Sequence, residues 1–318
     1  MPTLFLYIST VLIWGSTWYA ITLQLGNVAP EVSVAYRFAI AALLLLLFCW
    51  VRKKQLRYSV REHIWMAVQG FFLFCSNYVI FYIATAHLTS GLVSVVFSTI
   101  VFWNILFTRF IFGTPVSKRV LVGTALGIFG LALVFWPEVT GLNRSGSADY
   151  GLILCMIATV LASLGNIASV HNQNKALPVL QTNAFGMAYG AILTALYAWS
   201  SGLEFTWDTS MPYLASLLYL AVFGSILAFG AYLTLLGRIG AGQAAYSAVL
   251  FPIVALTLSV FLENYTFTAL AGLGVILVLG GNILALTKAK AFTKPCPQPP
   301  QDGPKDAQTT PVLSLKSE

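Results

Sequence analysis

Residues 91–130 read GLVSVVFSTIVFWNILFTRFIFGTPVSKRVLVGTALGIFG, and residues 242–281 read GQAAYSAVLFPIVALTLSVFLENYTFTALAGLGVILVLGG. A shift of 151 positions superimposes the two stretches without a gap, and five of the forty positions are then identical. The two stretches therefore share a pattern more than identical residues: a glycine, a long apolar run, a short polar hinge and a second apolar run with glycines seven residues apart. Such a repeated pair of spans is typical of an internally duplicated membrane transporter. The alternative is that any two adjacent membrane helices look alike.

Composition restricts the class of protein. The chain has 318 residues, of which 58% are hydrophobic and only 8% charged, and its mean hydropathy is +0.83. Soluble proteins average about 25% charged residues, so this sequence predicts an integral membrane protein. The net charge of +7 is 17 basic minus 10 acidic residues. These basic residues lie in loops between spans, which gives no sign of a nucleic-acid partner.

A bilayer core about 30 Å thick needs about 20 apolar residues per helix. On that criterion the sequence predicts ten membrane helices. Their approximate ranges are 4–23, 32–51, 64–84, 92–112, 120–136, 152–170, 182–199, 214–236, 244–262 and 267–286. We expect the first apolar run to be a retained helix, because no cleavage site for a signal peptide follows it.

Charge distribution orients these helices. If both termini share one side, all of the 17 basic residues except Arg37 and Arg144 fall on that side. The opposite side carries Glu31, Glu204 and Glu263 among its acidic residues. Because Lys and Arg favour the cytoplasm, we predict a multi-pass protein of the cell (inner) membrane with both termini cytoplasmic and an even number of spans.

The expected domain organisation follows from the duplication. Five helices per half is an odd number, so the second half enters the membrane in the opposite orientation. The predicted fold is therefore all-α, with ten transmembrane helices in two inverted five-helix repeats. We assign residues 1–137 to the first repeat, 138–150 to a linker and 151–287 to the second repeat. Residues 288–318 are rich in Pro, Lys and Gln, and are predicted to be a disordered cytoplasmic tail.

The first predicted helix contains a polar and aromatic motif, Trp14-Gly15-Ser16-Thr17-Trp18. The two tryptophans are four residues apart and so share one helical face. Small residues between them also suit close helix packing, which is the alternative reading. In the functional reading, Trp14, Thr17 and Trp18 line a central cavity, facing a second polar break around Asn166 in the sixth span. Matching polar breaks in two halves favour a site at the repeat interface.

Arg37 is the basic residue expected deepest inside a span. It lies about 9 Å from the outer end of the second helix, and no acidic residue lies deep in any span to pair with it. One interpretation is that its side chain reaches the outer headgroups or bonds backbone carbonyls. The other is that Arg37 faces the cavity and attracts an anionic group of the substrate.

Further polar residues occur on several predicted spans. Each is by itself more often a helix–helix hydrogen bond than a ligand contact. Their concentration nevertheless makes a shared substrate site plausible, and Pro252 predicts a kink in the ninth helix. The remaining candidate substrate-binding residues are Asn77, Tyr78, Tyr82, Ser98 and Tyr246.

Some motifs are missing from the sequence. It has no GxxxxGK[ST] loop and no HExxH motif, and its cysteines show no metal-ligand spacing. We therefore predict no catalytic residues, no metal and no cofactor, and we do not expect an enzyme. The spans also lack the buried carboxylates of a usual proton relay, so coupling to protons is expected to be weak or absent.

Taken in order, these motifs resemble the drug/metabolite transporter superfamily, in its ten-helix EamA-type branch. The resemblance covers about residues 4–287 and departs from the family pattern in the first half. It is carried by Trp14-Gly15-Ser16-Thr17-Trp18, Ala35-Tyr36-Arg37-Phe38, the glycines of 126–130, Pro252, Leu262-Glu263, Gly274 and Gly281-Asn282; the departures are Phe112-Gly113 and Val101.

The resemblance implies export of small metabolites, such as amino acids or related compounds, across the cytoplasmic membrane by alternating access. It implies a small-molecule substrate and the lipid bilayer as partners, with the protein a monomer or a homodimer. An alternative is a passive channel or facilitator for small solutes. An intramembrane enzyme would need facing pairs of ionisable groups, and a receptor would need a large extramembrane domain; the sequence shows neither.

Overall fold

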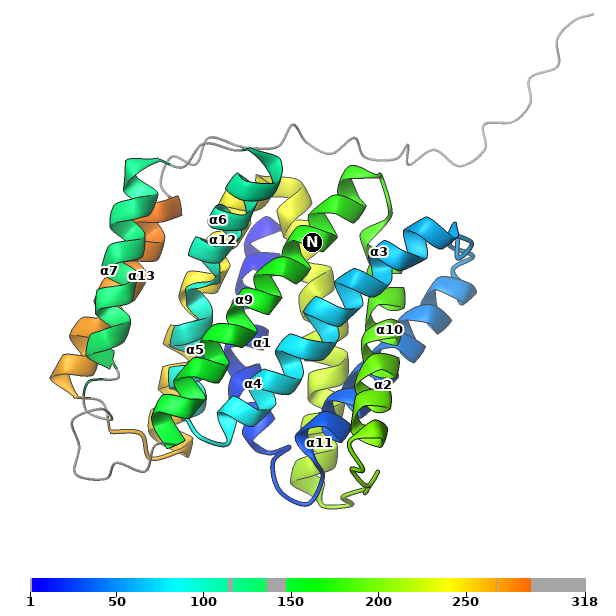
Figure 1. Cartoon of the computed structure of the whole chain (residues 1–318), viewed down its shortest axis with the longest axis horizontal. Coiled ribbons are helices and arrows are strands. Elements are labelled where there is room, and N and C mark those ends of the chain that lie inside the picture. The colour runs from blue at the N-terminus through cyan, green and yellow to red at the C-terminus, as the bar shows by residue number, and fades with distance from the viewer. Residues whose placement is uncertain (1, 114–116, 135, 137–146, 267, 287–318) are drawn as a thin grey trace, which may run out of the picture.

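The computed structural model describes residues 2–113, 117–134, 136, 147–266 and 268–286; within these ranges the side chains of 112, 147, 233, 236–246 and 286 are not described. Every regular element in this part of the chain is helical (Figure 1). In chain order the elements are α1 (Thr3–Thr22), α2 (Pro30–Val51), α3 (Val60–Gly70), η1 (Phe71–Ser76), α4 (Asn77–Thr85), α5 (Ser90–Ser98), α6 (Ile100–Phe112), α7 (Lys118–Val134), α9 (Ser147–Asn174), α10 (Val179–Ser200), α11 (Met211–Tyr219), η2 (Leu220–Leu227), α12 (Ala228–Leu262) and α13 (Ala269–Leu286).

The predicted all-α membrane fold is confirmed. Six helical stretches of the described chain are long and apolar enough to cross a membrane, by length and composition, and two shorter apolar stretches accompany them. The eighth and ninth spans are both contained in α12, whose 35 residues are all helical. The ring of Trp14 lies 5.0 Å from that of Phe229 and 5.6 Å from that of Phe251. Because 22 residues of straight helix would separate the last two by about 33 Å, α12 reverses direction between them and the two spans remain distinct. The predicted linker (apart from its last residues) and the tail lie outside the described residues.

Close packing of α7 against α13 reveals how the repeats are related. A Cβ atom on Gly123 would lie 2.4 Å from the carbonyl oxygen of Gly281, and one on Gly130 would lie 2.6 Å from that of Gly274. The two contacts run in opposite sequence directions, so the helices are antiparallel. A shift of 151 residues converts the first contact into the second. When equivalent helices pack antiparallel, the two-fold axis that relates them is perpendicular to the helices. This is the geometry of inverted repeats.

Other packing pairs follow the same symmetry. α2 packs against α10, and α5 packs against α12, each pair joining equivalent helices of the two repeats. α1 packs against α12 in the way that α9 packs against α6. In Figure 1, α7 and α13 stand at one end of the molecule, while α2 and α10 stand at the other. The helices between them enclose the site described below.

Helix irregularities also repeat. The chain widens into π-helical turns at η1 in the first repeat and at η2 in the second, and η1 shifted by 151 residues falls on 222–227, inside η2. In each, a serine hydroxyl donates to a carbonyl five residues earlier: Ser76 to Phe71 at 2.9 Å and Ser225 to Leu220 at 3.0 Å. Such bulges occur frequently at functional sites. The break between α5 and α6 at Thr99 likewise lies close to the position equivalent to Pro252.

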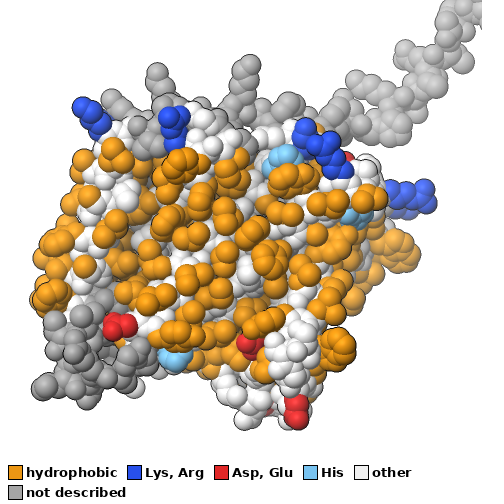
Figure 2. Space-filling view, in the orientation of Figure 1, with side chains coloured by type: hydrophobic (Ala, Val, Ile, Leu, Met, Phe, Trp, Pro, Cys, Tyr) orange, Lys and Arg blue, Asp and Glu red, His pale blue; other side chains and the backbone are white. Residues whose placement is uncertain are grey.

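The surface is an apolar belt between two charged edges. Figure 2 shows hydrophobic side chains across the middle, with Lys and Arg along one edge and most Asp and Glu along the opposite one. The basic edge is defined by Arg52, Lys53, Lys54, Arg109, Lys118, Arg119 and Lys175, and the acidic edge by Glu31, Glu204, Asp208 and Glu263. The belt is the surface expected to face acyl chains, with the two edges in the headgroup regions.

Candidate functional site

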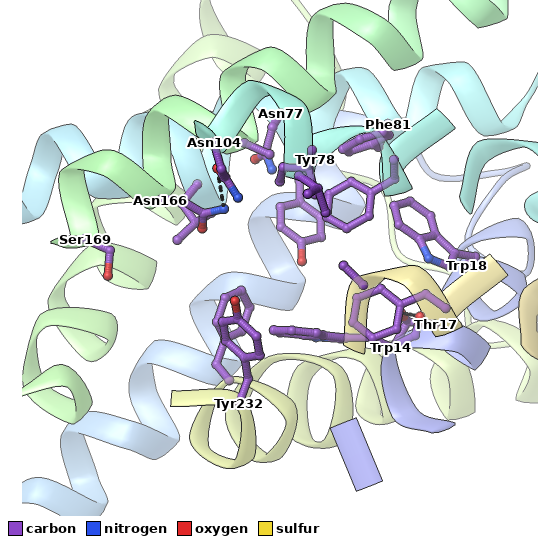
Figure 3. Close-up of a pocket in the computed structure, with 18 of the residues that line it drawn as sticks. Trp14, Thr17, Trp18, Asn77, Tyr78, Phe81, Asn104, Asn166, Ser169 and Tyr232 are labelled. Atoms are coloured by element: carbon purple, nitrogen blue, oxygen red, sulfur yellow. Dashed lines mark hydrogen bonds between the residues drawn. The ribbon is translucent and has the colours of Figure 1, made fainter. Parts of the chain in front are cut away.

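A central cavity lies between the two repeats. Its volume is about 110 Å³, several times the volume that one water molecule needs. Figure 3 shows Trp18 and Phe81 at one end of the cavity and Ser169 and Tyr232 at the other. The lining residues are Trp14, Thr17, Trp18, Ile21, Leu73, Asn77, Tyr78, Phe81, Phe97, Ile100, Val101, Asn104, Ala162, Asn166, Ser169, Asn183, Phe229, Tyr232, Ala248 and Phe251.

Many lining residues come in pairs separated by 151 positions, so the cavity straddles the repeat axis. The two members of each pair hold equivalent positions in the two repeats but have different side chains. The pairs are Trp18 with Ser169, Tyr78 with Phe229, Phe81 with Tyr232, Phe97 with Ala248, and Ile100 with Phe251. A duplicated scaffold therefore supplies the cavity, and divergence of the paired residues gives its two ends different shapes.

The end nearest the acidic edge is closed by three aromatic rings. Trp18, Phe81 and Phe97 contact one another with ring centroids 5.1 to 5.6 Å apart. We call these three residues the aromatic triad. Aromatic rings at such distances and tilts pack favourably. Their equivalents at the other end are Ser169, Tyr232 and Ala248, which are smaller or more polar.

Trp14 joins the first helix to the second repeat. Its indole Nε1 donates to the carbonyl of Gly224 at 3.0 Å. Its ring packs against Phe229 at 5.0 Å, Tyr232 at 5.2 Å and Phe251 at 5.6 Å. Trp14 therefore forms an apolar wall whose single donor is already used, and any ligand meets its ring rather than its N–H group.

Polar groups of the cavity fall into two sets. In the first, Asn104 Oδ1 accepts from Ser163 Oγ at 2.7 Å and from Asn166 Nδ2 at 3.3 Å, which ties α6 to α9. In the second, Asn77 Oδ1 and Trp18 Nε1 are buried without a hydrogen-bond partner in the part of the chain that the structure describes. Unpaired buried polar atoms are costly and usually have a functional explanation. One acceptor and one donor on residues that line the cavity are thus left without a partner among the described residues.

Arg37 is almost fully buried, with 1% of its side chain exposed, and so does not reach the outer headgroups. Its Nε donates to Ser225 Oγ at 3.2 Å and its Nη1 to Tyr82 Oη at 3.4 Å. The guanidinium carbon lies 4.6 Å from the centre of the Tyr78 ring. Among the described residues no carboxylate forms an ion pair with it. Arg37 thus places an uncompensated positive charge directly behind a ring that lines the cavity.

The structure brings most of the predicted site residues together. Ser98 instead joins two helices: it donates to Val95 and accepts from Asn282. Tyr246 lies in α12, but its side chain is outside the described part. The predicted residues that line the cavity are Trp14, Thr17, Trp18, Asn77, Tyr78 and Asn166; Arg37, Tyr82 and Ser98 do not line it.

Sequence reasoning did not select several residues that line the cavity. Asn104 sits in the middle of an apolar run, and this isolated amide is a signal that could have identified it. Asn183 follows Gln181 and Thr182 at the start of α10, where polar residues resemble an ordinary helix end. Phe229 and Tyr232 carry no signal of their own, because aromatic residues are abundant throughout the spans.

Chemistry at the site is limited to binding. None of the lining residues is Asp, Glu, Lys, Arg or His. Among the described residues no group of three or more His, Cys, Asp or Glu side chains could hold a metal ion. The cavity offers aromatic faces, amides, hydroxyls and the nearby positive charge of Arg37. Such a surface suits a small amphipathic molecule.

Comparison with known proteins gives a consistent picture. A sequence model described as the EamA-like transporter family matches residues 1–136 and 149–287. An "Uncharacterized inner membrane transporter YedA" of Escherichia coli K12 is 28% identical over 91% of this chain and 92% of its own length. A "Probable amino-acid metabolite efflux pump" of the same organism is 26% identical over 88% of this chain and 94% of its own. A crystal structure that is 17% identical shares the fold, with a TM-score of 0.65 over 89% of this chain and 96% of the other.

Proposed function

This chain belongs to the EamA-like transporter family, which confirms the resemblance found in the sequence, and from that premise we propose that it exports small metabolites by alternating access. It is a transporter and not an enzyme. The proposed substrates are amino acids or related compounds, and the proposed location is the inner membrane. Two relatives named in those terms support this specificity and location.

The observation that carries the proposal is a cavity on the repeat axis with one end closed. Alternating access needs a site that can open to either side in turn, and inverted repeats provide two conformations by exchanging their local structures. Here the aromatic triad packs across the acidic end, while two of the three equivalent residues at the basic end, Ser169 and Ala248, are smaller. We therefore propose that this is a carrier in the state that faces the basic edge.

Sidedness follows from charge. Positive residues concentrate in the cytoplasmic loops of membrane proteins, so the basic edge and both termini are proposed to be cytoplasmic. The state facing the basic edge would then take up substrate from the cytoplasm, and opening of the aromatic triad would release it outside. This direction agrees with an exporter.

Binding roles can be assigned to the cavity residues. Trp14 and Tyr78 would contact the apolar part of the substrate, while Asn77 Oδ1 would accept from a donor such as an ammonium group and Trp18 Nε1 would donate to an acceptor. Arg37 would favour a carboxylate or another anionic group from behind Tyr78, because a charge acts over several ångströms where the local dielectric constant is low.

Counterflow in reconstituted vesicles tests the proposal. Purified protein is placed in liposomes loaded with unlabelled candidates drawn from amino acids, nucleosides and organic anions, and uptake of the labelled compound is followed. A carrier gives transient, saturable accumulation driven by the internal unlabelled compound. Large fluxes without counterflow would instead support the passive channel, and no flux with any of the amino-acid or related compounds would remove the proposed substrate class.

A further inference from the structure

A second cavity opens on the side of the molecule. It lies between α2, α10 and the η2–α12 segment, with Leu45, Leu180, Met187 and Ile226 on its walls and Phe229 and Asn183 at its base. We call it the lateral groove. Its volume is about 190 Å³, against about 110 Å³ for the central cavity. Phe229 and Asn183 line both spaces, so they form the partition between them.

The open rim of the lateral groove faces the bilayer. Gly230 and Thr234 form this rim, and both are exposed. No heavy atom lies within 4 Å of the place where a Cβ atom of Gly230 would sit. Phe223 and Leu227, which share this helical face, are 44% and 47% exposed. Gly230 lies within the stretch Met211–Tyr232, which is apolar and long enough to cross a membrane, and Thr234 lies just beyond it. We therefore expect lipid acyl chains in front of Gly230, with Thr234 at the end of the rim nearer the headgroups.

Chemistry of the lateral groove favours an apolar occupant. Its side-chain oxygen atoms already have protein partners: Thr234 Oγ1 donates to the carbonyl of Gly230 at 2.8 Å, and Asn183 Oδ1 accepts from Gln69 at 2.8 Å. Ser225 Oγ donates to Leu220 and accepts from Arg37. None of the described residues that line it is charged. An apolar groove of this size loses dispersion contacts unless a chain fills it, and dispersion is the main packing force available within lipid.

We propose that the lateral groove binds one acyl chain of a bilayer lipid. The chain enters past Gly230 and Thr234 and packs between Leu180, Met187 and Ile226. Its end reaches Phe229, whose other side contacts Trp14 in the central cavity. The occupant therefore supports the wall of the substrate site from outside, whatever the substrate is.

Photo-crosslinking tests this site on the full-length protein. The protein is placed in nanodiscs that contain a phospholipid with a diazirine on its acyl chain, and labelled peptides are quantified after illumination. We expect residues 179–187 and 223–234 to be labelled about tenfold more than the lipid-facing part of α13, a ratio that corresponds to roughly 1.4 kcal/mol of preferential binding. Even labelling of all lipid-facing helices would overturn the proposal.

Two matched variants locate the chain. Gly230→Phe fills the mouth of the lateral groove and is expected to remove the preferential labelling. Gly280→Phe is its control, because Gly280 is also exposed on an apolar helix with nothing within 4 Å, and labelling should stay unchanged. Thr234→Phe replaces the first variant if that protein does not fold, as judged by its thermal unfolding. Preferential labelling that survives a folded rim variant would place the lipid elsewhere.

Discussion

Replacement of Arg37 by methionine tests whether a buried charge behind the cavity wall selects anionic substrates. Methionine keeps much of the side-chain volume and removes the charge. The fold should tolerate the change, because a buried charge without a counter-charge carries a desolvation cost that an apolar side chain of similar size does not. Ser225 Oγ keeps its bond to Leu220 in the variant. We therefore expect a folded protein whose affinity changes only for substrates that carry negative charge.

The size of the effect follows from distance. The guanidinium carbon is 4.6 Å from the centre of the Tyr78 ring, and a ligand on the other face of the ring lies about 3.5 Å beyond it. The separation between the two charges is then about 8 Å. With an effective dielectric constant of about 20, two unit charges at this distance attract by roughly 2 kcal/mol. Loss of the charge should weaken binding of a carboxylate about 30-fold.

The assay compares two ligands on each protein. Dissociation constants are measured for a substrate found by the vesicle screen and for the same compound with its carboxylate replaced by a carboxamide. We expect Arg37→Met to weaken only the carboxylate form, and Arg37→Lys, which keeps a positive charge, to retain most of the preference. Equal weakening of both ligands would mean that Arg37 only supports the structure around Tyr78, and the electrostatic reasoning would be wrong.

Three further predictions concern symmetry, closure and pH. Gly130→Ala and the equivalent Gly281→Ala each place a methyl group against an opposing carbonyl, so each should lower unfolding stability by a similar amount of about 1–3 kcal/mol. Clearly unequal losses in thermal unfolding would contradict the two-fold relation. Phe97→Ala should make vesicles leaky to the substrate, whereas Ala248→Phe should block uptake, and unchanged flux in both would exclude the triad as the closure. The Ser210 amide and Asn27 hold the pKa of Asp208 below its usual range. The carboxylate therefore stabilises the fold at neutral pH, and this contribution is lost as the pH falls through the lowered pKa. Asp208→Asn should show a smaller loss of thermal stability than the unchanged protein when the pH is lowered from about 6 to about 3.

The membrane fold could be predicted because composition and span length leave little freedom. In a bilayer, backbone groups must bond within the helix, so an apolar run of about 20 residues has essentially one structure. The spacing of Gly123 and Gly130 was also informative, because only glycine allows the backbone contacts seen between α7 and α13. The π-helical turns of η1 and η2 could not be predicted, since no residue type marks them. The helical backbone between the eighth and ninth spans could not be predicted either, since apolar length marks the spans and not the geometry of the residues that join them.

The site was only partly predictable, since a sequence gives the depth of a residue in a span better than the side of the helix on which its side chain lies. Asn77 and Asn166 stood out as amides in apolar runs, and both line the cavity. Arg37 stood out equally, yet the packing of α2 against α10 and η2 directs its guanidinium behind Tyr78. Ser98 turned towards Asn282 for the same reason. Helix rotation is fixed by tertiary contacts, and one sequence does not contain those contacts in readable form.

In the proposed mechanism, the divergence of the two repeats favours one of the two open states of the transporter. Perfectly equivalent repeats would make the two open states equal in free energy, because exchanging the repeats would convert one state into the other. Here Trp18, Phe81 and Phe97 bury aromatic surface against one another at the acidic end, and the corresponding ring contacts cannot form between Ser169, Tyr232 and Ala248. Each aromatic pair contributes about 0.5–1.5 kcal/mol beyond its buried area. Two or three such contacts amount to a few kcal/mol, which is enough to favour the state facing the basic edge by about tenfold or more, and substrate binding must then supply the energy that opens the aromatic triad.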